Sequence, residues 1–457
     1  MSETVETAIP QQKTMTPEEI SATTRLHNYG TWRFQKSWTP MYIADAEGCY
    51  FVDGAGKRYL DLSAQLMCVN LGHKNPRVIE SIAEQARELT YVAPGYATRA
   101  RARLSEKLLE VLPAGLTKFF FATSGTEANE AAFKIARMYT GKTKIISRYR
   151  SYHGSTMASI AATGDPRRWA MEPGGKGGGF IFAPETNCYD CPIKHTYPSC
   201  NIACADYIEH MIENESDVAA VILEPVVGTN GVLVPPPEYF PRIREICDRH
   251  GVLLIADEVM AGWGRTGKWF AVDHWGVTPD ILVTAKGITS AYMPLGLCAT
   301  TAKIADYFED HYFAHGHTYE AHPMTLGPGV ATIEEMQRLK LVERAAELEP
   351  YVREKLEALK AKHSSVGDVR GLGLFFAVEI VKNRETKKLF NTYSDKVEGK
   401  PLVVDQIAAK MLAQGVSIQA WVSHFVIAPP LIVTKEELDF GIAALDEHLA
   451  IADALVE

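Results

Sequence analysis

The sequence predicts an α/β protein in which a large domain is built on a mostly parallel sheet and a smaller domain has an α+β arrangement. Four short, continuously apolar segments lie in the middle of the chain, at 119–121, 220–223, 252–255 and 281–283. Amphipathic patterns of helical length separate them, for example over 239–250. Uninterrupted apolar strands that alternate with helices are typical of a parallel sheet covered on both faces. The last third of the chain mixes helical and short strand patterns, which indicates the smaller domain.

These patterns divide the 457 residues into four parts. Residues 1–20 are rich in Pro, Gln, Thr and Glu and are predicted to be a flexible tail, because they offer little to bury. We expect 21–69 to be the N-terminal segment of the small domain, 70–326 to be the large domain, and 327–457 to complete the small domain.

The C-terminal part shows a recognisable succession of elements. A long helical pattern covers 334–360, and a strand pattern follows at 374–380. The segment 382–400 is hydrophilic and is predicted to be an exposed insertion. A helical pattern at 404–414 and a strand pattern at 425–428 then lead to a helical end.

Composition excludes several classes of protein. A content of 46% hydrophobic and 23% charged residues is ordinary for a soluble globular protein, and it excludes a disordered chain, a collagen-like fibre and a small disulfide-stapled domain. The net charge of −9 argues against a nucleic-acid partner, since such proteins usually carry a basic surface. No apolar run approaches the roughly 20 residues that span a bilayer, and no signal peptide is recognisable. We therefore predict a cytoplasmic enzyme without a membrane partner.

Polar residues follow each of the four apolar segments directly. The first leads into Ser124-Gly125-Thr126-Glu127, the second into Glu224, the third into Asp257 and the fourth into Lys286. In an open parallel sheet, ligands bind at the carboxyl ends of the strands. A single carboxylate after a strand is as often a helix cap or a surface charge. Four such strand ends together point to a functional site.

The segment after the first strand has the features of an anion site. Ser124 and Glu127 have the spacing of a capping box, which by itself predicts only the start of a helix. A helix N-terminus also attracts a phosphate, and Gly125 allows the close approach of such a group. Ser124 and Thr126 would add hydroxyl donors.

The lysine and the aspartate complete a recognisable constellation. Lys286 follows a buried strand, and a lysine in a desolvated pocket can act as a Schiff-base nucleophile. Asp257 ends a strand of apolar residues, so its carboxylate needs a cationic partner, and a pyridinium nitrogen would serve. Together with the phosphate cradle, these residues describe a site for pyridoxal 5'-phosphate.

The chain resembles the class III aminotransferases, which are fold type I enzymes that depend on pyridoxal phosphate, and especially their ω-transaminase branch. The resemblance extends from about Trp38 to Val433. The motifs that carry it are Asp61-Leu62-Ser63, Asn70-Leu71-Gly72-His73, Ser124-Gly125-Thr126-Glu127-Ala128-Asn129-Glu130, Tyr152-His153-Gly154, Glu224-Pro225-Val226, Asp257-Glu258-Val259, Gly262-Trp263-Gly264-Arg265-Thr266-Gly267, Lys286-Gly287, Pro294-Leu295-Gly296, His317-Thr318-Tyr319 and Ala428-Pro429-Pro430-Leu431. Each motif alone is weak, but their order and spacing are specific.

The resemblance implies which residues bind the cofactor and which are catalytic. Lys286 is expected to form the Schiff base and to move the proton, Asp257 to pair with the pyridinium nitrogen, and Tyr152 to stack on the ring. The implied cofactor-binding residues are Ser124, Gly125, Thr126, Tyr152, His153, Glu224, Asp257, Val259, Lys286 and Thr318.

Four of these residues have further implied roles or an alternative. Val259 is expected on the second face of the ring, and Glu224 near Tyr152 and Arg265. Thr318 resembles the threonine that reaches the phosphate of the neighbouring subunit, so we predict a homodimer, or a larger homo-oligomer, with a shared active site. For His153 the alternative is a packing or hydrogen-bonding role, and for Arg265 it is a salt bridge.

The sequence departs from the family where the substrate is expected. Many ω-transaminases place a carboxylate-binding arginine shortly before the Ala-Pro-Pro motif, and Gln419 occupies the matching position here. Glutamine cannot form the bidentate, charged pair that arginine forms, so amines, ω-amino acids or aminosulfonates are the expected donors and glutamate is expected to be poor. Alternatively the loop is shifted and another basic residue serves. The predicted substrate-pocket residues are Leu66, Met67, Tyr96, Gln419 and Trp421.

Four cysteines, Cys188, Cys191, Cys200 and Cys204, cluster in one segment with His195 between them. Their spacing resembles a zinc or iron–sulfur loop. Reduced cysteines or a disulfide are the alternatives, and because the resembling family needs no metal, we predict none.

The predicted activity is the transfer of an amino group from an amine or ω-amino acid, of the β-alanine or taurine type, to pyruvate. Racemases, aminomutases and phospholyases share nearly all of these cofactor residues and stay open as alternatives, as does an aminotransferase that uses 2-oxoglutarate. A non-catalytic metal or redox scaffold is disfavoured, because it leaves Lys286, Asp257 and Ser124 without a role.

Overall fold

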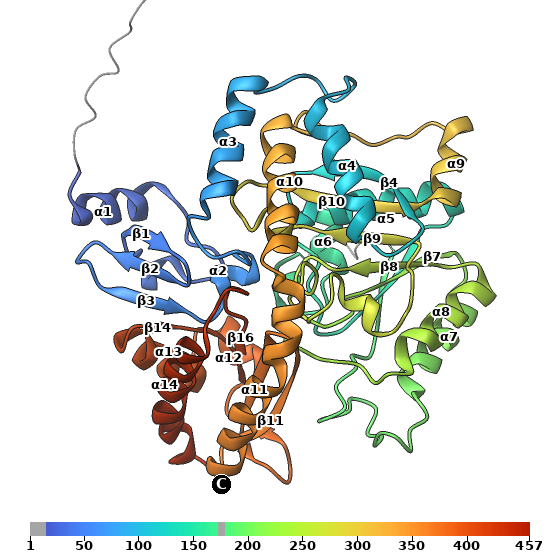
Figure 1. Cartoon of the computed structure of the whole chain (residues 1–457). Helices are drawn as coiled ribbons and strands as arrows, with labels where there is room; N and C mark the ends of the chain where they lie inside the picture. Colours follow the sequence, from blue (N-terminus) through green and yellow to red (C-terminus); the bar gives the residue numbers. More distant parts are fainter. Residues whose placement is uncertain (1–14, 172–178) are drawn as a thin grey trace, which may run out of the picture.

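The computed structural model describes residues 15–171 and 179–457. Its chain forms three sheets, of seven, five and four strands, with helices packed around them (Figure 1). The predicted α/β architecture with one large, mostly parallel sheet is confirmed.

The large sheet has the strand order β4-β10-β9-β8-β7-β5-β6. Its strands are β4 (Leu116–Ala122), β5 (Lys144–Arg148), β6 (Phe180–Ala183), β7 (Val218–Leu223), β8 (Leu253–Asp257), β9 (Ile281–Thr284) and β10 (Gly296–Thr301). Only β10 runs against its two neighbours, so the other six strands point the same way. Their carboxyl ends therefore lie along one edge of the sheet.

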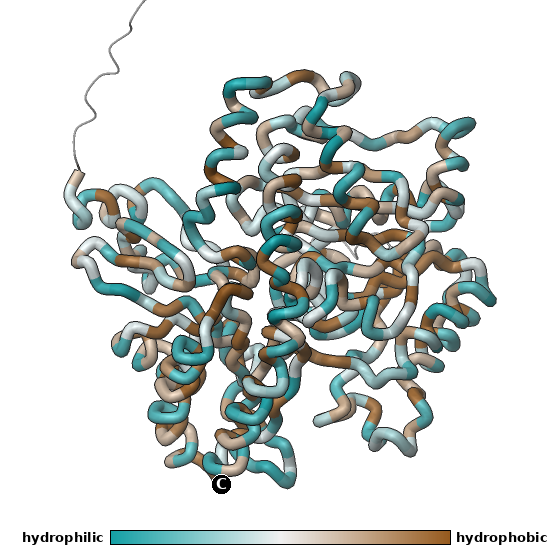
Figure 2. The backbone as a smooth tube through the Cα atoms, in the orientation of Figure 1, coloured by the Kyte–Doolittle hydropathy of each residue, from teal (hydrophilic) through white to brown (hydrophobic). Residues whose placement is uncertain are grey.

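The four apolar segments of the sequence lie in β4, β7, β8 and β9, as predicted. Every residue of β7, β8 and β9 is buried, because helices cover both faces of the sheet. Neighbouring residues of β9 show the two faces. Ile281 and Val283 pack in one hydrophobic cluster with residues of α5, whereas Leu282 packs in another with residues of α4 and α10. The hydrophobic colouring of Figure 2 is accordingly dense along these central strands.

Six helices of the large domain surround this sheet. They are α4 (Arg99–Val111), α5 (Gly125–Thr140), α6 (Met157–Ala162), α7 (Ala203–Glu215), α8 (Tyr239–His250) and α9 (Ala302–Asp310). Helix α8 has the bounds predicted from its amphipathic pattern. Two short 3₁₀ helices, η2 (Pro166–Ala170) and η5 (Lys286–Thr289), lie next to the site described below.

The N-terminal segment begins with a helix inside the predicted tail. Helix α1 (Pro17–His27) starts with proline at its first position, and the Thr16 and Glu19 side chains form a capping box. Residues 17–20 are therefore helical, and 1–14 lie outside the described residues. The elements that follow are β1 (Ile43–Glu47), β2 (Tyr50–Asp53), β3 (Arg58–Asp61), α2 (Ala64–Met67) and α3 (Pro76–Glu88).

One sheet joins the N-terminal segment to the C-terminal part, and a second sheet is built from C-terminal strands. Strand β14 (Val416–Ser417) pairs in parallel with β3 and so extends the β1-β2-β3 sheet (Figure 1). The second sheet consists of β11 (Val366–Leu372), β12 (Phe375–Asn383), β13 (Lys388–Leu389), β15 (Gln419–Trp421) and β16 (His424–Ile427). The helices of this part are α10 (Pro323–Arg338), α11 (Leu341–Lys362), α12 (Tyr393–Val397), α13 (Val403–Ala413) and α14 (Lys435–Asp453).

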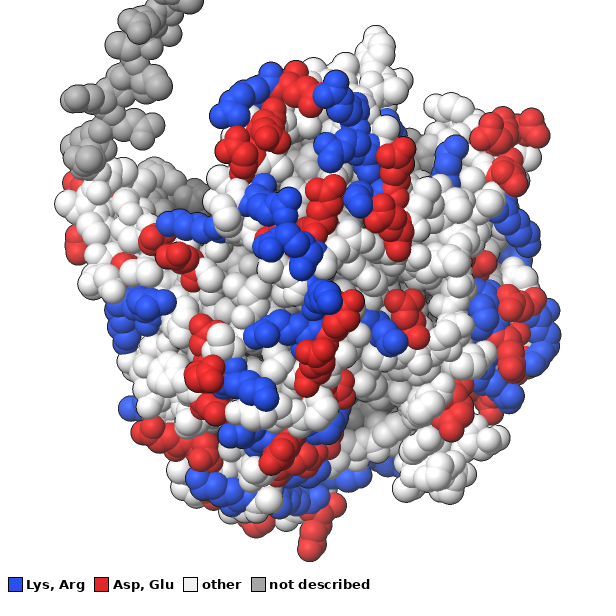
Figure 3. All heavy atoms as spheres, viewed as in Figure 1, with Lys and Arg blue, Asp and Glu red and all other residues white. Residues whose placement is uncertain are grey.

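Charged side chains of both signs intermingle on the face shown in Figure 3. Ion pairs join α3 and α4 to α10, for example Arg77 to Glu335 at 3.4 Å and Arg103 to Glu334 at 3.6 Å. Within the described residues, no helix combines the length and apolarity needed to cross a membrane.

Candidate active site

The carboxyl edge of the large sheet lines a cavity of about 230 Å³. Helix α5 begins there after β4, and β7, β8 and β9 end there. The predicted cofactor residues that line this cavity are Ser124, Gly125, Thr126, Tyr152, His153, Glu224, Asp257, Val259 and Lys286. Of the ten predicted cofactor residues, only Thr318 lies elsewhere.

The start of α5 forms a cradle that only small residues allow. Ser124 is the N-cap, and its hydroxyl accepts a hydrogen bond from the Glu127 backbone N–H at 3.4 Å. A Cβ atom on Gly125 would lie 2.8 Å from Val259, and one on Gly154 would lie 2.2 Å from the Thr126 hydroxyl. These glycines therefore let Val259 and Thr126 pack closely around the helix N-terminus, where backbone N–H groups and the helix dipole favour a phosphate.

The predicted capping box forms only in part. The Glu127 carboxylate accepts a hydrogen bond from the backbone N–H of Thr123 at 2.8 Å, rather than from that of Ser124. The Thr126 hydroxyl accepts hydrogen bonds from the backbone N–H groups of Ser155 and Thr156 at 3.1 and 3.2 Å. It thereby ties the cradle to the neighbouring segment.

Three donors hold the buried carboxylate of Asp257. Its Oδ2 accepts a hydrogen bond from Asn129 Nδ2 at 2.9 Å and lies 2.7 Å from His153 Nδ1, and its Oδ1 accepts one from the Val259 N–H at 3.1 Å. His153 is thus a hydrogen-bonding residue. Asn129 belongs to a motif recognised in the sequence, but sequence reasoning gave it no role.

Lys286 occupies the strained junction between β9 and η5. Its φ of +50° is a left-handed conformation that is uncommon for a residue with a side chain. Burial lowers the pKa of its ammonium group, although the nearby Asp257 and Glu224 act in the opposite direction. Among the described residues, its Nζ has no hydrogen-bond partner. A lysine whose proton is held less tightly is suited to nucleophilic and proton-transfer chemistry.

Glu224 supports the site, although not beside Arg265 as predicted. Its Oε1 accepts a hydrogen bond from the Tyr152 N–H at 2.9 Å and its Oε2 one from the Gly228 N–H at 2.8 Å. Arg265 is fully buried elsewhere, where Asn70 Oδ1 at 2.6 Å and the Pro429 carbonyl accept its hydrogen bonds. Arg265 therefore connects segments of the fold, and no carboxylate within the described residues forms a salt bridge with it.

The residues present fit pyridoxal 5'-phosphate. The cradle at α5 suits the phosphate, and the fixed carboxylate of Asp257 suits a cationic ring nitrogen. Lys286 supplies the amine. The cavity therefore combines an anion site, a carboxylate and a lysine, which are the groups that bind this cofactor.

The comparisons with known proteins agree with this geometry. Residues 34–449 match the family described as aminotransferase class-III.

The chain belongs to the class III aminotransferases.

Relatives of this aminotransferase differ in their named activities. It is 35% identical to a leucine/methionine racemase of Thermococcus litoralis over 91% of each chain. It is 34% identical to a taurine–pyruvate aminotransferase of Bilophila wadsworthia over 90% of this chain and 92% of the other. The solved taurine:2-oxoglutarate aminotransferase of Bifidobacterium kashiwanohense, in complex with PLP and glutamate, superposes with a TM-score of 0.92 at 38% identity, over 97% of this chain and 100% of the other. The aminotransferase thus uses pyridoxal 5'-phosphate as its cofactor.

The structure places most of the predicted substrate-pocket residues of the aminotransferase away from the Lys286 cavity. Met67 is 2% exposed, packs in a hydrophobic cluster and is not among the residues that line this cavity. The Gln419 amide donates a hydrogen bond to the Ala420 carbonyl at 3.3 Å and does not line the cavity. Leu66 and Tyr96 are exposed on the surface of the chain.

A cation that sequence reasoning missed lies beside this cavity. The Arg167 guanidinium is 3.8 Å from the centre of the Tyr152 ring, 4.8 Å from that of Trp421 and 5.5 Å from that of Trp32. Asp165 Oδ2 accepts a hydrogen bond from Arg167 Nε at 2.9 Å. Asp165 is the N-cap of η2, and Pro166 and Arg167 begin it; no sequence motif indicated this segment as part of the site.

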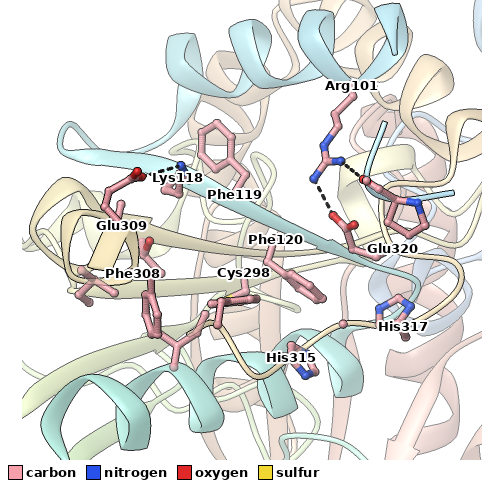
Figure 4. A pocket seen from close by; sticks show the side chains of 18 residues that line it. Arg101, Lys118, Phe119, Phe120, Cys298, Phe308, Glu309, His315, His317 and Glu320 are labelled. Atoms are coloured by element: carbon pink, nitrogen blue, oxygen red, sulfur yellow. Dashed lines mark hydrogen bonds and ion pairs between the residues drawn. The ribbon is translucent and has the colours of Figure 1, made fainter. Parts of the chain in front are cut away.

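Thr318 lies on a separate part of the surface. The Tyr91 hydroxyl donates a hydrogen bond to the Thr318 carbonyl at 2.9 Å, and Tyr319 beside it is 59% exposed. The flanking His317 and Glu320 line a cavity of about 580 Å³, in which Arg101 pairs with Glu320 at 2.8 Å (Figure 4).

The four clustered cysteines line a small cavity of about 20 Å³ together with His195. All four are free, and burial raises the pKa of the Cys204 thiol to about 11. Among the described residues, the ligand atoms that lie within 4.8 Å of one another are those of Glu209, Glu213 and His250, and the cysteines do not form such a group. Within the described residues, no disulfide joins these four cysteines.

Proposed function

We propose that this aminotransferase moves the amino group of short ω-amino acids or aminosulfonates to pyruvate, and that Arg167 binds the anionic end of the donor. The observation that carries the proposal is the Arg167 guanidinium, which lies over the ring of Tyr152 at the Lys286 cavity. The named activity of the taurine–pyruvate relative supports the donor class.

Arg167 has the capacity to bind an acid group. Its hydrogen bonds to Asp165 use Nε and Nη2, and Nη1 has no hydrogen-bond partner among residues 15–171 and 179–457. Rings of Trp32, Tyr152 and Trp421 surround the guanidinium, so the surroundings are partly desolvated. A charge-assisted hydrogen bond to a carboxylate or sulfonate is strongest in such surroundings.

The residues of the Lys286 cavity perform separate parts of the reaction. Pyridoxal phosphate, when bound, supplies an aldehyde that takes up the amino group and a ring that accepts electrons. The Ser124 and Thr126 hydroxyls and the N–H groups of α5 bind the phosphate. Asp257 stabilises the positive charge of the ring nitrogen. Lys286 Nζ accepts the proton from the reacting carbon and returns it, because burial lowers its pKa and so favours the neutral amine that can act as a base.

A second candidate function uses 2-oxoglutarate as the acceptor. Arg167 favours it, because a cation that binds the acid end of an ω-amino acid can equally bind the distal carboxylate of a dicarboxylate. The taurine:2-oxoglutarate name of the solved relative points the same way. Under this alternative Arg167 takes over the role of the arginine that Gln419 replaces.

Arg167→Met should lower kcat/KM for β-alanine and taurine by roughly tenfold to a hundredfold, since a hydrogen bond to a charged group contributes about 1.5–3 kcal/mol. The kcat/KM for propylamine, a donor without an acid group, should change much less. Alanine formation from pyruvate and glutamate formation from 2-oxoglutarate measure the activity and identify the acceptor.

Arg168→Met is the matched control for this experiment. Arg168 lies on the same 3₁₀ helix, but its guanidinium lies over Phe182 at 4.5 Å instead of over Tyr152. An equal loss for all three donors in Arg167→Met would contradict the assigned role. Loss of optical activity of L-leucine without any 2-oxo acid would instead identify a racemase.

We also propose that the enzyme acts as a homodimer in which Thr318 completes the phosphate site of the partner. Thr318→Ala should weaken cofactor retention roughly three- to tenfold, which is the effect of one hydrogen bond of about 1 kcal/mol, without lowering the melting temperature of the apoenzyme. Equilibrium dialysis of the cofactor and sedimentation velocity are the measurements. A monomer that retains cofactor and activity would refute the shared site.

A further inference from the structure

Asn230 lies in the loop between β7 and α8 and binds three other segments of the chain. Its side chain is fully buried. The amide Nδ2 donates a hydrogen bond to Asp165 Oδ2 at 3.0 Å. The amide Oδ1 accepts hydrogen bonds from Trp421 Nε1 at 3.1 Å and from the Tyr393 hydroxyl at 3.4 Å. One side chain therefore joins η2, β15 and α12, and it anchors the segment 382–400 that was predicted to be an exposed insertion.

The backbone around Asn230 is also held in place by side chains. The carbonyl oxygens of residues 229, 230 and 231 accept hydrogen bonds, in that order, from His424 at 2.8 Å, Arg150 at 2.7 Å and Arg370 at 2.6 Å. Arg150 follows β5 of the large sheet, whereas Arg370 lies on β11 and His424 on β16. The loop is thus fixed by both domains, and the Asn230 amide has a defined position.

The hydrogen bonds of Asn230 require an amide. On one side the group donates to a carboxylate, and on the other side it accepts from an indole N–H and a phenol O–H. An ionised aspartate could accept these bonds but could not donate, and an aliphatic side chain could do neither. Loss of the amide would leave a buried carboxylate or a buried indole N–H without its partner, which is costly.

The bond from Asn230 decides where Asp165 and Arg167 lie together. The Asp165 carboxylate also accepts hydrogen bonds from Arg167 Nε and from the Arg167 backbone N–H, each at 2.9 Å. These two bonds fix Arg167 relative to Asp165, but they do not fix the pair relative to the reacting centre. In the part of the chain that the structure describes, Asn230 is the only hydrogen-bond donor to this carboxylate from outside η2. Asn230 therefore holds the pair where the Arg167 guanidinium lies over Tyr152.

Asn230 also restrains the indole ring beside Arg167. The Arg167 guanidinium lies 4.8 Å from the centre of the Trp421 ring, and the Nε1 of this ring donates to Asn230 Oδ1. A hydrogen bond at the edge of the indole opposes its rotation. Two contacts of Arg167, one with a carboxylate and one with an aromatic ring, thus depend on the same amide.

We infer that Asn230 is a positioning residue, which holds Arg167 over Tyr152 and so sets the preference of the enzyme for donors with an acid end. The inference rests on the proposed function, because that function gives Arg167 its role at the substrate. Asn230 is not among the residues that line the Lys286 cavity, so it acts through Arg167.

The test compares two donors, β-alanine and propylamine, in the cofactor-loaded Asn230→Asp enzyme with pyruvate as the acceptor. The new carboxylate has the shape of the amide but faces the carboxylate of Asp165, and repulsion between the like charges should displace Asp165 together with Arg167. The kcat/KM for β-alanine should fall about tenfold, because the hydrogen bond from Arg167 to the acid end is weakened, and the kcat/KM for propylamine should stay within about twofold. Asn230→Ser, whose hydroxyl is too short to bind both Asp165 and Trp421, gives the same comparison if Asn230→Asp does not fold.

A second measurement repeats the substitution in the Arg167→Met enzyme. Asn230→Asp should cause no further loss for β-alanine there, because a residue that acts through Arg167 has nothing left to position. Asn187→Asp is the matched control. Asn187 is a buried asparagine of the large domain, and its Oδ1 accepts a hydrogen bond from the Asp190 N–H at 3.5 Å, which an aspartate can also accept. The ratio of the two kcat/KM values should be unchanged in this control.

Three results would overturn the inference. They are an unchanged kcat/KM for β-alanine in Asn230→Asp, equal losses for both donors, and a further loss in the Arg167→Met enzyme. A crystal structure of the Asn230→Asp enzyme tests the positioning without any donor, and a guanidinium of Arg167 that stays over Tyr152 would also refute it. An unchanged donor ratio in Arg167→Met alone would instead contradict the proposed function, and the crystal structure would still decide whether Asn230 positions Arg167.

Discussion

Lys286→Ala is expected to abolish aminotransfer while the fold stays intact. Lys286 has a strained, left-handed backbone conformation after β9, and its ammonium makes no hydrogen bond within the described residues. Removal of the side chain should therefore abolish the reaction but cost little folding stability. Loss of the group that moves the proton should cost at least about a thousandfold in the first half-reaction. Single-turnover absorbance of the cofactor with β-alanine measures this rate, and circular dichroism checks the fold.

Lys118→Ala is the control for this variant. Lys118 is exposed on β4 and pairs with Glu309 at 3.8 Å. The Lys118→Ala enzyme should therefore transfer amino groups at the rate of the unmodified enzyme. A Lys286→Ala enzyme that did the same would show that another residue carries the proton, and the assignment of the whole cavity would be wrong.

Asp257→Asn is expected to produce the second largest loss. A neutral amide stabilises a positively charged ring nitrogen poorly, so the cofactor accepts electrons less readily. The half-reaction should slow by more than about tenfold, which corresponds to ~1.4 kcal/mol of activation free energy. Rates are compared at full cofactor occupancy, so that weaker binding is not mistaken for slower chemistry.

The surroundings of Asp257 make this substitution informative. Asn129 and His153 both bind Oδ2, and the Val259 N–H donates to Oδ1, so the group that replaces the carboxylate stays in place. Asp306→Asn, an exposed change on α9, is the control. A rate in Asp257→Asn equal to that of the unmodified enzyme would mean that the ring nitrogen does not depend on this charge.

Local sequence rules were sufficient for the cofactor cavity. Ser124 starts a helix, and Glu224, Asp257 and Lys286 follow strands, so each position depends on residues next to it in the chain. Parallel strands then bring their carboxyl ends to one edge without further information. Nine of the ten cofactor residues predicted from motifs line one cavity for this reason.

Local rules were less successful where a backbone reverses without a strong signal. The helical pattern over 334–360 is interrupted in the structure, because Lys340 takes a left-handed conformation between α10 and α11. A glycine at this position would have indicated a left-handed turn, but a lysine does not. Residues 17–20 show the opposite case. Thr16, Pro17 and Glu19 are typical of the start of a helix. The prediction of a tail rested on the low apolar content of 1–20 and did not use these residues.

The sequence by itself thus determined the family, the cofactor and the residues at the strand ends, since these follow from neighbouring residues and from strand direction. Only the tertiary structure brought together the aromatic and basic side chains around Arg167, which we propose to bind the substrate. Trp421, Arg167 and Lys396 come from segments far apart in the chain, and Trp421 is held by Asn230, 191 positions away. Gln419 and Trp421 lie two residues apart on β15 and therefore on the same face of the strand, so spacing could not show that Trp421 lies beside Arg167 whereas the Gln419 amide donates to the Ala420 carbonyl. That choice depends on how the small domain packs on the large sheet.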